Sequence, residues 1–335
     1  MLKLLKAYKK IILIALLPYL AVLFVLIYPT SYSVTAPGGL TPVDDFIAID
    51  GIELQDNFYT IHVLSYYPIT LFQSWILKND ERMDVDPITP LERDTSAYEN
   101  YLKGQLSKHV SLNNSIISAY ELASEVRDDV YVNYTFDGLY VYTRPSRLSE
   151  LKIGDHVVKI NGTSFEGLTP QAFADLIDMN QFELTVRREV SGVDIEVDIN
   201  YVKQEEDVNF SFYIKYNIID SFPSFDLPGL NQIVGGPSGG LLQTLTLYAS
   251  LVNINIGDDK IAGTGTISVT GNVGRIGGIT QKIYTAIDQN VDIFFIPISH
   301  VSEIENIDFD FILVPVSNLR EAVKWLYEYY DGSIL

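Results

Sequence analysis

The chain has 335 residues, of which 47% are hydrophobic and 20% are charged, so it has a globular composition and room for two or three domains. Its formal net charge of −20 argues against nucleic acid as a partner, because phosphate would be repelled. It has no cysteine, so its stability must come from packed cores and not from disulfide bonds.

The N-terminal residues have the pattern of a membrane anchor. Residues 1–43 contain no Asp or Glu, and four lysines lie among residues 1–10. An uncharged stretch, "IILIALLPYLAVLFVLIY", follows at 11–28. At a rise of about 1.5 Å per residue, this stretch nearly crosses a hydrocarbon core of about 30 Å.

We therefore predict a single-pass transmembrane helix over 11–28. The lysines place the tail, 1–10, in the cytoplasm and the bulk of the chain outside the cell membrane. A cleaved signal peptide is the alternative. Its best cleavage site would lie near "SVTAPGG" at 33–39, where no clean pair of small residues precedes the cut.

Residues 29–128 are predicted to form a stalk followed by a mixed α+β spacer or lid. The stalk, 30–43, is rich in Thr, Ser, Pro and Gly. Residues 44–68 alternate like strands, and 97–126 have helical spacing. This region carries no recognisable chemistry.

Residues 129–203 change to a β-rich pattern. A strand at 137–143 and a second at 151–165 are predicted first, the latter with a tight Asn-Gly turn. A helix follows at 168–178, with Thr169 as its cap and Pro170 at its first position. Two alternating strands complete the unit at 182–188 and 193–202.

This unit resembles a PDZ domain of the kind attached to bacterial proteases. The resemblance rests on Gly138-Leu139-Tyr140-Val141, on Gly154-Asp155 and Asn161-Gly162, and on the capped helix. It implies that a peptide adds as a strand along Gly138, Leu139, Tyr140 and Val141, in a groove closed by the helix at 170–178. A plain β-rich packing module is the alternative.

Residues 204–335 are predicted to form an α/β domain. Strands are expected at 209–218, 261–269, 291–297 and 309–316. Helices are expected at 238–252, 280–289 and 318–330, the last with Asn318 and Glu321 in a capping box.

A single hydroxyl stands among glycines in "GGPSGG", residues 235–240, where the first of these helices begins. Glycines let the backbone approach a ligand closely, and the free amides at a helix start suit a developing oxyanion at Ser238. A phosphate loop is the competing interpretation, but no G-x-x-x-x-G-K-[ST] pattern is present. An ordinary glycine turn also fits this stretch taken alone.

A serine nucleophile needs a base. None of the four histidines, His62, His109, His156 and His300, lies in a recognisable triad setting, so we interpret them as structural. Lys282 opens a predicted helix among isoleucines, and both the helix dipole and desolvation disfavour its charged form. It is therefore the candidate base, with a solvated surface lysine as the alternative.

Three stretches, "GGPSGG", "GTGTI" and "GRIGGITQKIYTA", together resemble the proteolytic domain of Lon proteases, which are Ser-Lys dyad peptidases. The resemblance implies Ser238 as nucleophile, Lys282 as its base and Thr264 as a neighbour of the lysine. It implies Gly236, Pro237 and Gly239 as the backbone around the oxyanion. Lon enzymes usually carry Asp and Ala where this chain has Gly235 and Gly239, which leaves the tuning of the site open.

The order of units resembles membrane-anchored PDZ-Lon proteases of Gram-positive-type bacteria. That resemblance implies a multidomain fold and an extracytoplasmic, ATP-independent serine endopeptidase that needs no metal or cofactor. Its partners would be peptide or protein substrates and the membrane, and a homo-oligomer is compatible with it. The alternative function is a membrane-tethered PDZ adaptor whose protease-like domain is a scaffold.

Overall fold

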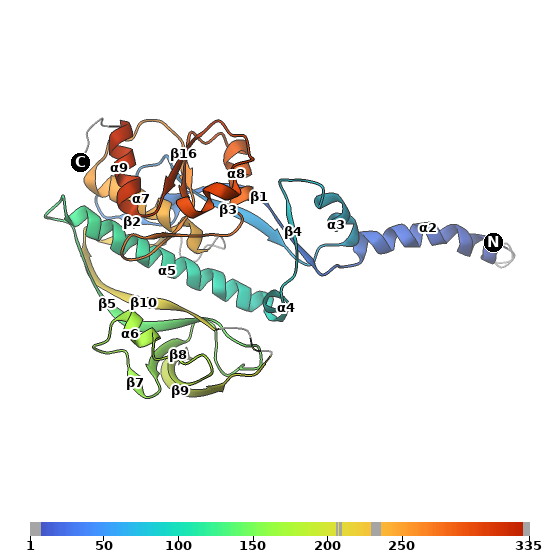
Figure 1. Cartoon of the computed structure of the whole chain (residues 1–335), viewed down its shortest axis with the longest axis horizontal. Helices are drawn as coiled ribbons and strands as arrows, with labels where there is room; N and C mark the ends of the chain where they lie inside the picture. The colour runs from blue at the N-terminus through green and yellow to red at the C-terminus, as the bar shows by residue number, and fades with distance from the viewer. Residues whose placement is uncertain (1–7, 206, 208–209, 229–235, 331–335) are drawn as a thin grey trace.

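The computed structural model of the chain describes residues 8–205, 207, 210–228 and 236–330. Two β-sheet units lie on opposite sides of one long helix, α5 (Ala97–Ser124), and an N-terminal helix projects away from them (Figure 1). The upper unit in this view contains the C-terminal elements, and the lower unit is an inserted module.

The sheet of the upper unit combines strands from both ends of the chain. Its order is β16 (Ile312–Val316), β15 (Ile293–Pro297), β12 (Ile261–Gly263), β3 (Phe58–Tyr66), β1 (Tyr32–Pro42) and β4 (Asp84–Pro87). The first four strands are parallel, and β1 runs antiparallel to both β3 and β4. Parallel strands need helices on both faces, and this sheet has them.

One face of the sheet is covered by α5, α7 (Gly240–Val252) and α9 (Leu319–Tyr330), which share a core with Phe58 and Phe295. The other face packs against α8 (Ile279–Asp288), whose Ile279 and Ile283 meet Phe294. α9 has the predicted cap, because the Asn318 side chain accepts the amide of Glu321 at 3.0 Å.

These strands change the predicted division of the chain. Residues 29–128 were expected to be a stalk and spacer, but β1 and β3 lie inside the upper sheet, and Phe58 of β3 pairs with Ile261 of β12. The stretch 30–43 is mostly strand because the backbone of β1 pairs on both sides. The N-terminal third and the C-terminal third therefore form one unit.

The inserted module has its own sheet and core. The order is β10 (Ser211–Phe222), β5 (Tyr131–Thr143), β6 (His156–Ile160), β8 (Gln181–Val190) and β9 (Val193–Val202), with β7 (Thr163–Ser164) on β6. The helix α6 (Pro170–Ala174) begins at the predicted cap, where Thr169 accepts the amide of Ala172. The predicted boundary at 203 differs from the structure, since β10 pairs along β5 and completes the module.

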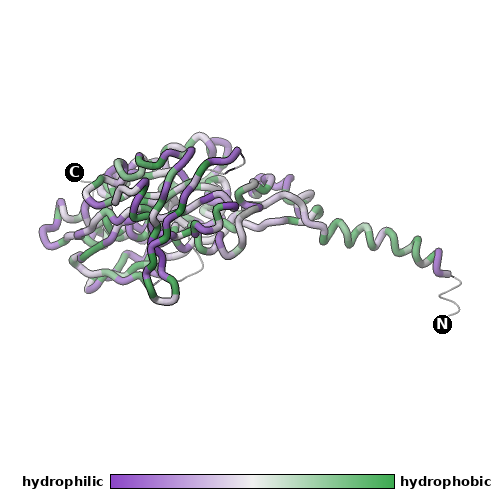
Figure 2. Tube along the Cα trace, turned by 90° about the horizontal axis from the view of Figure 1, so that it is seen from below, coloured by the Kyte–Doolittle hydropathy of each residue, from purple (hydrophilic) through white to green (hydrophobic). Residues whose placement is uncertain are grey.

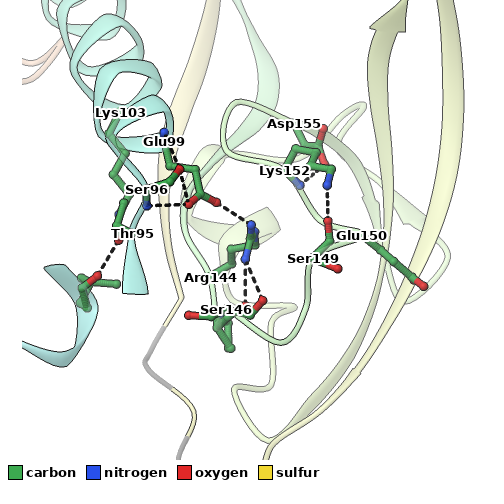
Figure 3. A network of polar contacts seen from close by, with 12 residues as sticks. Thr95, Ser96, Glu99, Lys103, Arg144, Ser146, Ser149, Glu150, Lys152 and Asp155 are labelled. Atoms are coloured by element: carbon green, nitrogen blue, oxygen red, sulfur yellow. Dashed lines mark hydrogen bonds and ion pairs between the residues drawn. The ribbon is translucent and has the colours of Figure 1, made fainter. Parts of the chain in front are cut away.

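The module docks on α5 through a few polar contacts. Arg144 donates to the carboxylate of Glu99 on α5 at 2.7 Å, and both side chains are mostly shielded from solvent (Figure 3). Farther along the helix, the hydroxyl groups of Ser107 and Tyr213 lie 3.3 Å apart. The helix α5 is thus held by the module on one side and by the upper unit on the other.

After Lys9 and Lys10, the N-terminal helix α2 (Lys9–Ile27) is predominantly apolar (Figure 2). Its apolar stretch is not buried in the molecule, and its contacts include the short helix α3 (Leu71–Leu77). It is long and apolar enough to cross a membrane, which by length and composition alone is weak support for an anchor. Residues 1–7 of the predicted cytoplasmic tail lie outside the described residues.

Candidate active site

Ser238 lies in a single 3₁₀ turn, Pro237–Gly239, that leads directly into α7. Gly236 precedes the turn with a φ of 144°, a conformation that favours glycine. The carbonyl of Ser238 accepts the amide of Gly265 at 2.8 Å and the hydroxyl of Thr264 at 3.1 Å. These two bonds fix the backbone of the turn while its side chain, only partly buried, faces a cavity.

Gly239 has a specific reason to be glycine in this chain. A Cβ at this position would lie 2.9 Å from the methyl carbon of Thr60, a distance that forces a shift. Thr60 belongs to β3, so the strand packs against the turn. The alanine that Lon enzymes usually carry here would meet this contact. Gly235, the other departure, lies outside the described residues.

Helix α5 supports the turn from the protein interior. Ser111 donates to the carbonyl of Pro237 at 3.3 Å, and Ser115 lies 3.1 Å from the carbonyl of Gly240. Both hydroxyls also approach the side-chain oxygen of Gln243, at 3.4 and 3.3 Å. The Ser115 hydroxyl also lies 2.8 Å from the carbonyl of Ser111, so its single proton is shared between its own helix and the turn. Helix α5 therefore contacts carbonyls on both sides of Ser238.

Lys282 lies in the first turn of α8, after Gly278 at a φ of 65°. Its residue surface is 2% exposed. The ammonium group donates to the Thr264 hydroxyl at 2.8 Å, and no carboxylate pairs with Lys282 among the described residues. Burial lowers the pKa of Lys282 to about 7. A buried lysine without a counter-charge loses its proton readily and becomes a general base near neutral pH.

Thr264 connects the two ends of this arrangement. Its hydroxyl donates to the Ser238 carbonyl, so its lone pairs remain to accept the N–H of Lys282. The residue is completely buried. Thr264 therefore orients the amine beside the turn that carries Ser238, and in the neutral amine the nitrogen lone pair is left free for a proton.

Ser238 and Lys282 line the same cavity, which has a volume of about 540 Å³. Its walls come from β1 and β3, from the turn at Pro237–Gly239, and from residues 275–278, which precede α8. In the part of the chain that the structure describes, no cluster of three or more His, Asp or Glu side chains is placed to hold a metal ion. The arrangement can carry out acyl transfer by a serine and an amine base.

Two further side chains lie near Ser238. His62, which the sequence analysis interpreted as structural, lines the cavity, and burial, followed by the charge of Lys282, lowers its pKa. Lys108 of α5 lies with Gly236 and Gly239 around a small cavity behind Ser238. A helical row of polar residues, Ser107, Ser111, Ser115 and Ser118, was the available signal that α5 approaches the site.

His300 has the structural role expected of the histidines. It is buried, its Nε2 accepts the amide of Ile276 at 3.0 Å, and its Nδ1 lies 3.0 Å from Glu303. Because Nε2 accepts this hydrogen bond, the tautomer of His300 has its proton on Nδ1. His300 thereby holds the turn that forms one wall of the cavity.

The peptide edge predicted at Gly138, Leu139, Tyr140 and Val141 is not open. Leu139 pairs with Ile214 of β10 on one side and with Val157 of β6 on the other. The side chains of Leu139 and Val141 are buried in the module core. An added strand needs free amides and carbonyls, so it cannot bind along this segment.

Ser238, Thr264 and Lys282 fall within a stretch of the chain that matches known proteins. Residues 196–325 match the family model of the Lon protease (S16) C-terminal proteolytic domain. Lon protease 1 of Borreliella burgdorferi is 29% identical over 133 residues, which are 38% of this chain and 16% of that protein. The Lon protease of Neorickettsia sennetsu is 30% identical over 94 residues, 27% of this chain and 11% of that protein.

The C-terminal part of the chain is therefore a Lon-type proteolytic domain. The chain spans about a sixth or less of the length of these curated relatives. The match begins within β9, whereas the structure adds to the same unit the strands β1, β3 and β4, far upstream of residue 196.

Proposed function

We propose that this protein is a serine endopeptidase in which Ser238 is the nucleophile and Lys282 is the general base. The observation that carries the proposal is the buried Lys282, bonded to Thr264 and lining one cavity with Ser238 inside a Lon-type domain. A pKa of about 7 leaves roughly half of the amines neutral at pH 7. A scaffold would gain nothing from burying an amine in this state.

In the proposed reaction, neutral Lys282 takes the Ser238 proton as the oxygen attacks the scissile carbonyl. Backbone N–H groups of the turn from Gly236 to Gly239 stabilise the oxyanion. The intermediate collapses when protonated Lys282 gives its proton to the leaving amine, which leaves an acyl-enzyme. Water then attacks the ester carbon, Lys282 again accepts and returns the proton, and the carboxylic acid product leaves.

We further propose that α2 anchors the enzyme in the cell membrane, with its N-terminus in the cytoplasm and the two units outside. The apolar length of the helix and the lysines before it support this topology. Protease added to intact, wall-stripped cells should then degrade the region after residue 28. Protection of that region would contradict the extracellular orientation, and loss of α2 from the mature protein would indicate a cleaved signal peptide.

The inserted module has a different proposed role from strand addition at Leu139. We propose that it acts on the proteolytic unit through α5, which contacts both. The alternative, an adaptor with an inactive protease-like scaffold, requires that Ser238 be dispensable.

The test of the dyad uses the full-length chain in detergent, without ATP. A fluorophosphonate probe and a denatured protein substrate are presented to wild type, to Ser238→Ala and to Ser299→Ala, an exposed serine in the same unit. We expect labelling and cleavage by wild type and Ser299→Ala and neither by Ser238→Ala. Equal cleavage by all three would overturn the assignment of Ser238.

A further inference from the structure

The short helix α3 (Leu71–Leu77) exposes an apolar face. Leu71, Phe72, Trp75 and Ile76 are 37%, 38%, 71% and 47% exposed, respectively. Their spacing places them on one side of the helix. A contiguous apolar patch of this kind marks a surface that another apolar phase covers.

The position of α3 in the molecule indicates which apolar phase covers this face of the helix. The amide of Leu71 donates to the carbonyl of Tyr28, the residue that ends α2, at 3.1 Å. The amide of Thr30 donates to the carbonyl of Ile69 at 2.8 Å. Helix α3 therefore starts at the level where α2 ends, beside the exit of the chain from that helix (Figure 1).

Aromatic residues gather at the same level. Tyr28 and Tyr66 are 49% and 58% exposed, and the rings of Phe72 and Trp75 lie 6.4 Å apart. Trp and Tyr are enriched where hydrocarbon meets headgroups, because their rings are apolar and their polar atoms remain hydrated. The body side of this region is polar instead, with Arg82 paired to Asp288 of α8.

We propose that α3 lies in the outer headgroup layer of the bilayer that α2 crosses, with Trp75 and Phe72 inserted among lipids. Short amphipathic helices bind at this depth by burying their apolar side. The inference rests on the proposed anchor and is independent of the chemistry at Ser238.

This contact fixes the height of the catalytic cavity above the membrane. Thr35 and Ser65, which line the cavity, lie on β1 and β3 close to where these strands meet α2 and α3. Thr35 comes seven positions after Tyr28, which at about 3.3 Å per position is at most about 23 Å. The substrates within reach are polypeptide segments that emerge from the membrane surface.

Tryptophan fluorescence tests the seat of α3, because the chain has only two tryptophans. Trp325→Phe leaves Trp75 as the reporter, and Trp75→Phe leaves Trp325. Trp325 stacks on Tyr329 in α9, at the end of the molecule away from α2 (Figure 1). Each full-length variant is reconstituted into phosphatidylcholine vesicles with bromine at shallow or deep acyl positions, and circular dichroism checks its fold.

We expect shallow bromine to remove at least half of the Trp75 emission, deep bromine to remove less, and neither to affect Trp325. Iodide in the buffer should quench Trp325 more than Trp75. If the protein floats with the vesicles but Trp75 is quenched only by iodide, α3 stands off the bilayer and the proposal is wrong. If the protein does not float with vesicles, the anchor fails and this proposal fails with it, whereas labelling of Ser238 in detergent is unaffected.

The substrate class is tested with membrane-inserted reporters that carry one cleavable segment at increasing distance from the bilayer. We expect wild type to cut the nearest segment faster than the same peptide free in solution, and Trp75→Glu to reduce that advantage without slowing the free peptide. Equal advantage in both enzymes would show that α3 does not set the height of the site.

Discussion

Each unit of the molecule buries an ionisable side chain near the start of a helix or strand. The two side chains differ in whether they have a partner of opposite charge. In the inserted module, Asp155 accepts the amide of Lys152 at 2.7 Å and pairs with Arg188. In the proteolytic unit, Lys282 meets the hydroxyl of Thr264. Both residues are about equally hidden, at 3% and 2% exposure.

The difference shows what separates a structural charge from a reactive one. Burial raises the pKa of Asp155, and hydrogen bonds from the Lys152 amide and Arg188, together with the charge of Arg188, offset part of that rise. Burial is the only cause acting on Lys282, and its pKa falls to about 7. A paired buried charge stabilises one geometry, whereas an unpaired one titrates in the range where catalysis needs it.

We expect the largest loss of activity when residue 282 carries a permanent positive charge. Lys282→Arg keeps the positive charge but cannot accept a proton at neutral pH, since guanidinium stays protonated. We expect kcat/KM for a short peptide to fall at least about a thousandfold. Thermal melting of the variant controls for misfolding, and an active, folded arginine variant would mean that another group takes the proton.

The pH dependence should show the titration of Lys282 directly. The base works in its neutral form and its pKa is lowered to about 7, so activity should be lost as pH falls below 7. Well below the pKa the loss should be about tenfold per pH unit, so that activity at pH 5 is about a hundredfold below the plateau that is reached above about pH 8.

His62 is the other titratable group beside Lys282, so it supplies the control. Rates are measured on the full-length enzyme from pH 5 to 9, alongside His62→Gln. The loss of activity below pH 7 should persist in this variant. Disappearance of this loss would assign the titration to His62 instead of Lys282.

Stability should change in opposite directions at the two buried charges. Asp155→Ala leaves Arg188 without its partner and should lower the free energy of unfolding by about 3 kcal/mol. Lys282→Met removes a desolvated amine and should raise it by about 1 to 3 kcal/mol at pH 7, at the expense of activity. Urea unfolding followed by circular dichroism measures both.

The gain from Lys282→Met should also depend on pH. The lysine pKa is about 7 in the folded chain and about 10.5 when unfolded, so the unfolded state binds more protons between these values. The cost of burying the amine is therefore full below pH 7 and disappears as pH rises toward 10.5. A gain that is the same at pH 7 and pH 9.5 would contradict the shifted pKa.

Local motifs predicted that Ser238 and Lys282 lie at the starts of helices, because glycines and nearby isoleucines act within a few residues of each, and the structure places both at one cavity. Their roles as nucleophile and base stay predictions. The role of 29–128 was not predictable in the same way. Phe58 pairs with Ile261 and Thr60 with Gly263, partners about two hundred residues apart that no local pattern connects. A strand can be read from alternation, but its neighbours depend on which distant segment completes the sheet.

The same limit explains the closed edge at Leu139. The strand predicted at 137–143 is confirmed, because β5 (Tyr131–Thr143) includes this range. Its second neighbour, β10, lies some seventy residues later and was assigned to the following domain. The sequence therefore indicated the type of element but not which edge stays open.

The smallest effect should come from the support that α5 gives the nucleophile turn. Ser115→Ala removes a buried hydroxyl that lies 2.8 Å from the carbonyl of Ser111 and 3.1 Å from that of Gly240. A loss of up to about 1 kcal/mol at the turn should lower kcat by up to about fivefold with KM unchanged. Ser118→Ala is the matched control, because this serine is buried on the same helix and lies against Gly271 instead of the turn. Equal effects of the two variants would mean a general loss of helix stability.

Whether the inserted module acts through this helix is then measured by a double-mutant cycle. Arg144→Ala breaks the contact with Glu99 (Figure 3). Glu99 precedes Ser115 by sixteen residues on α5, which is about 24 Å at a rise of about 1.5 Å per residue. Distant, independent sites add to within about 0.5 kcal/mol. We expect a larger interaction energy in kcat, because a helix loosened at the module end can no longer hold the turn firmly. Additivity within that margin would show that α5 is a passive support and that the module works by another route.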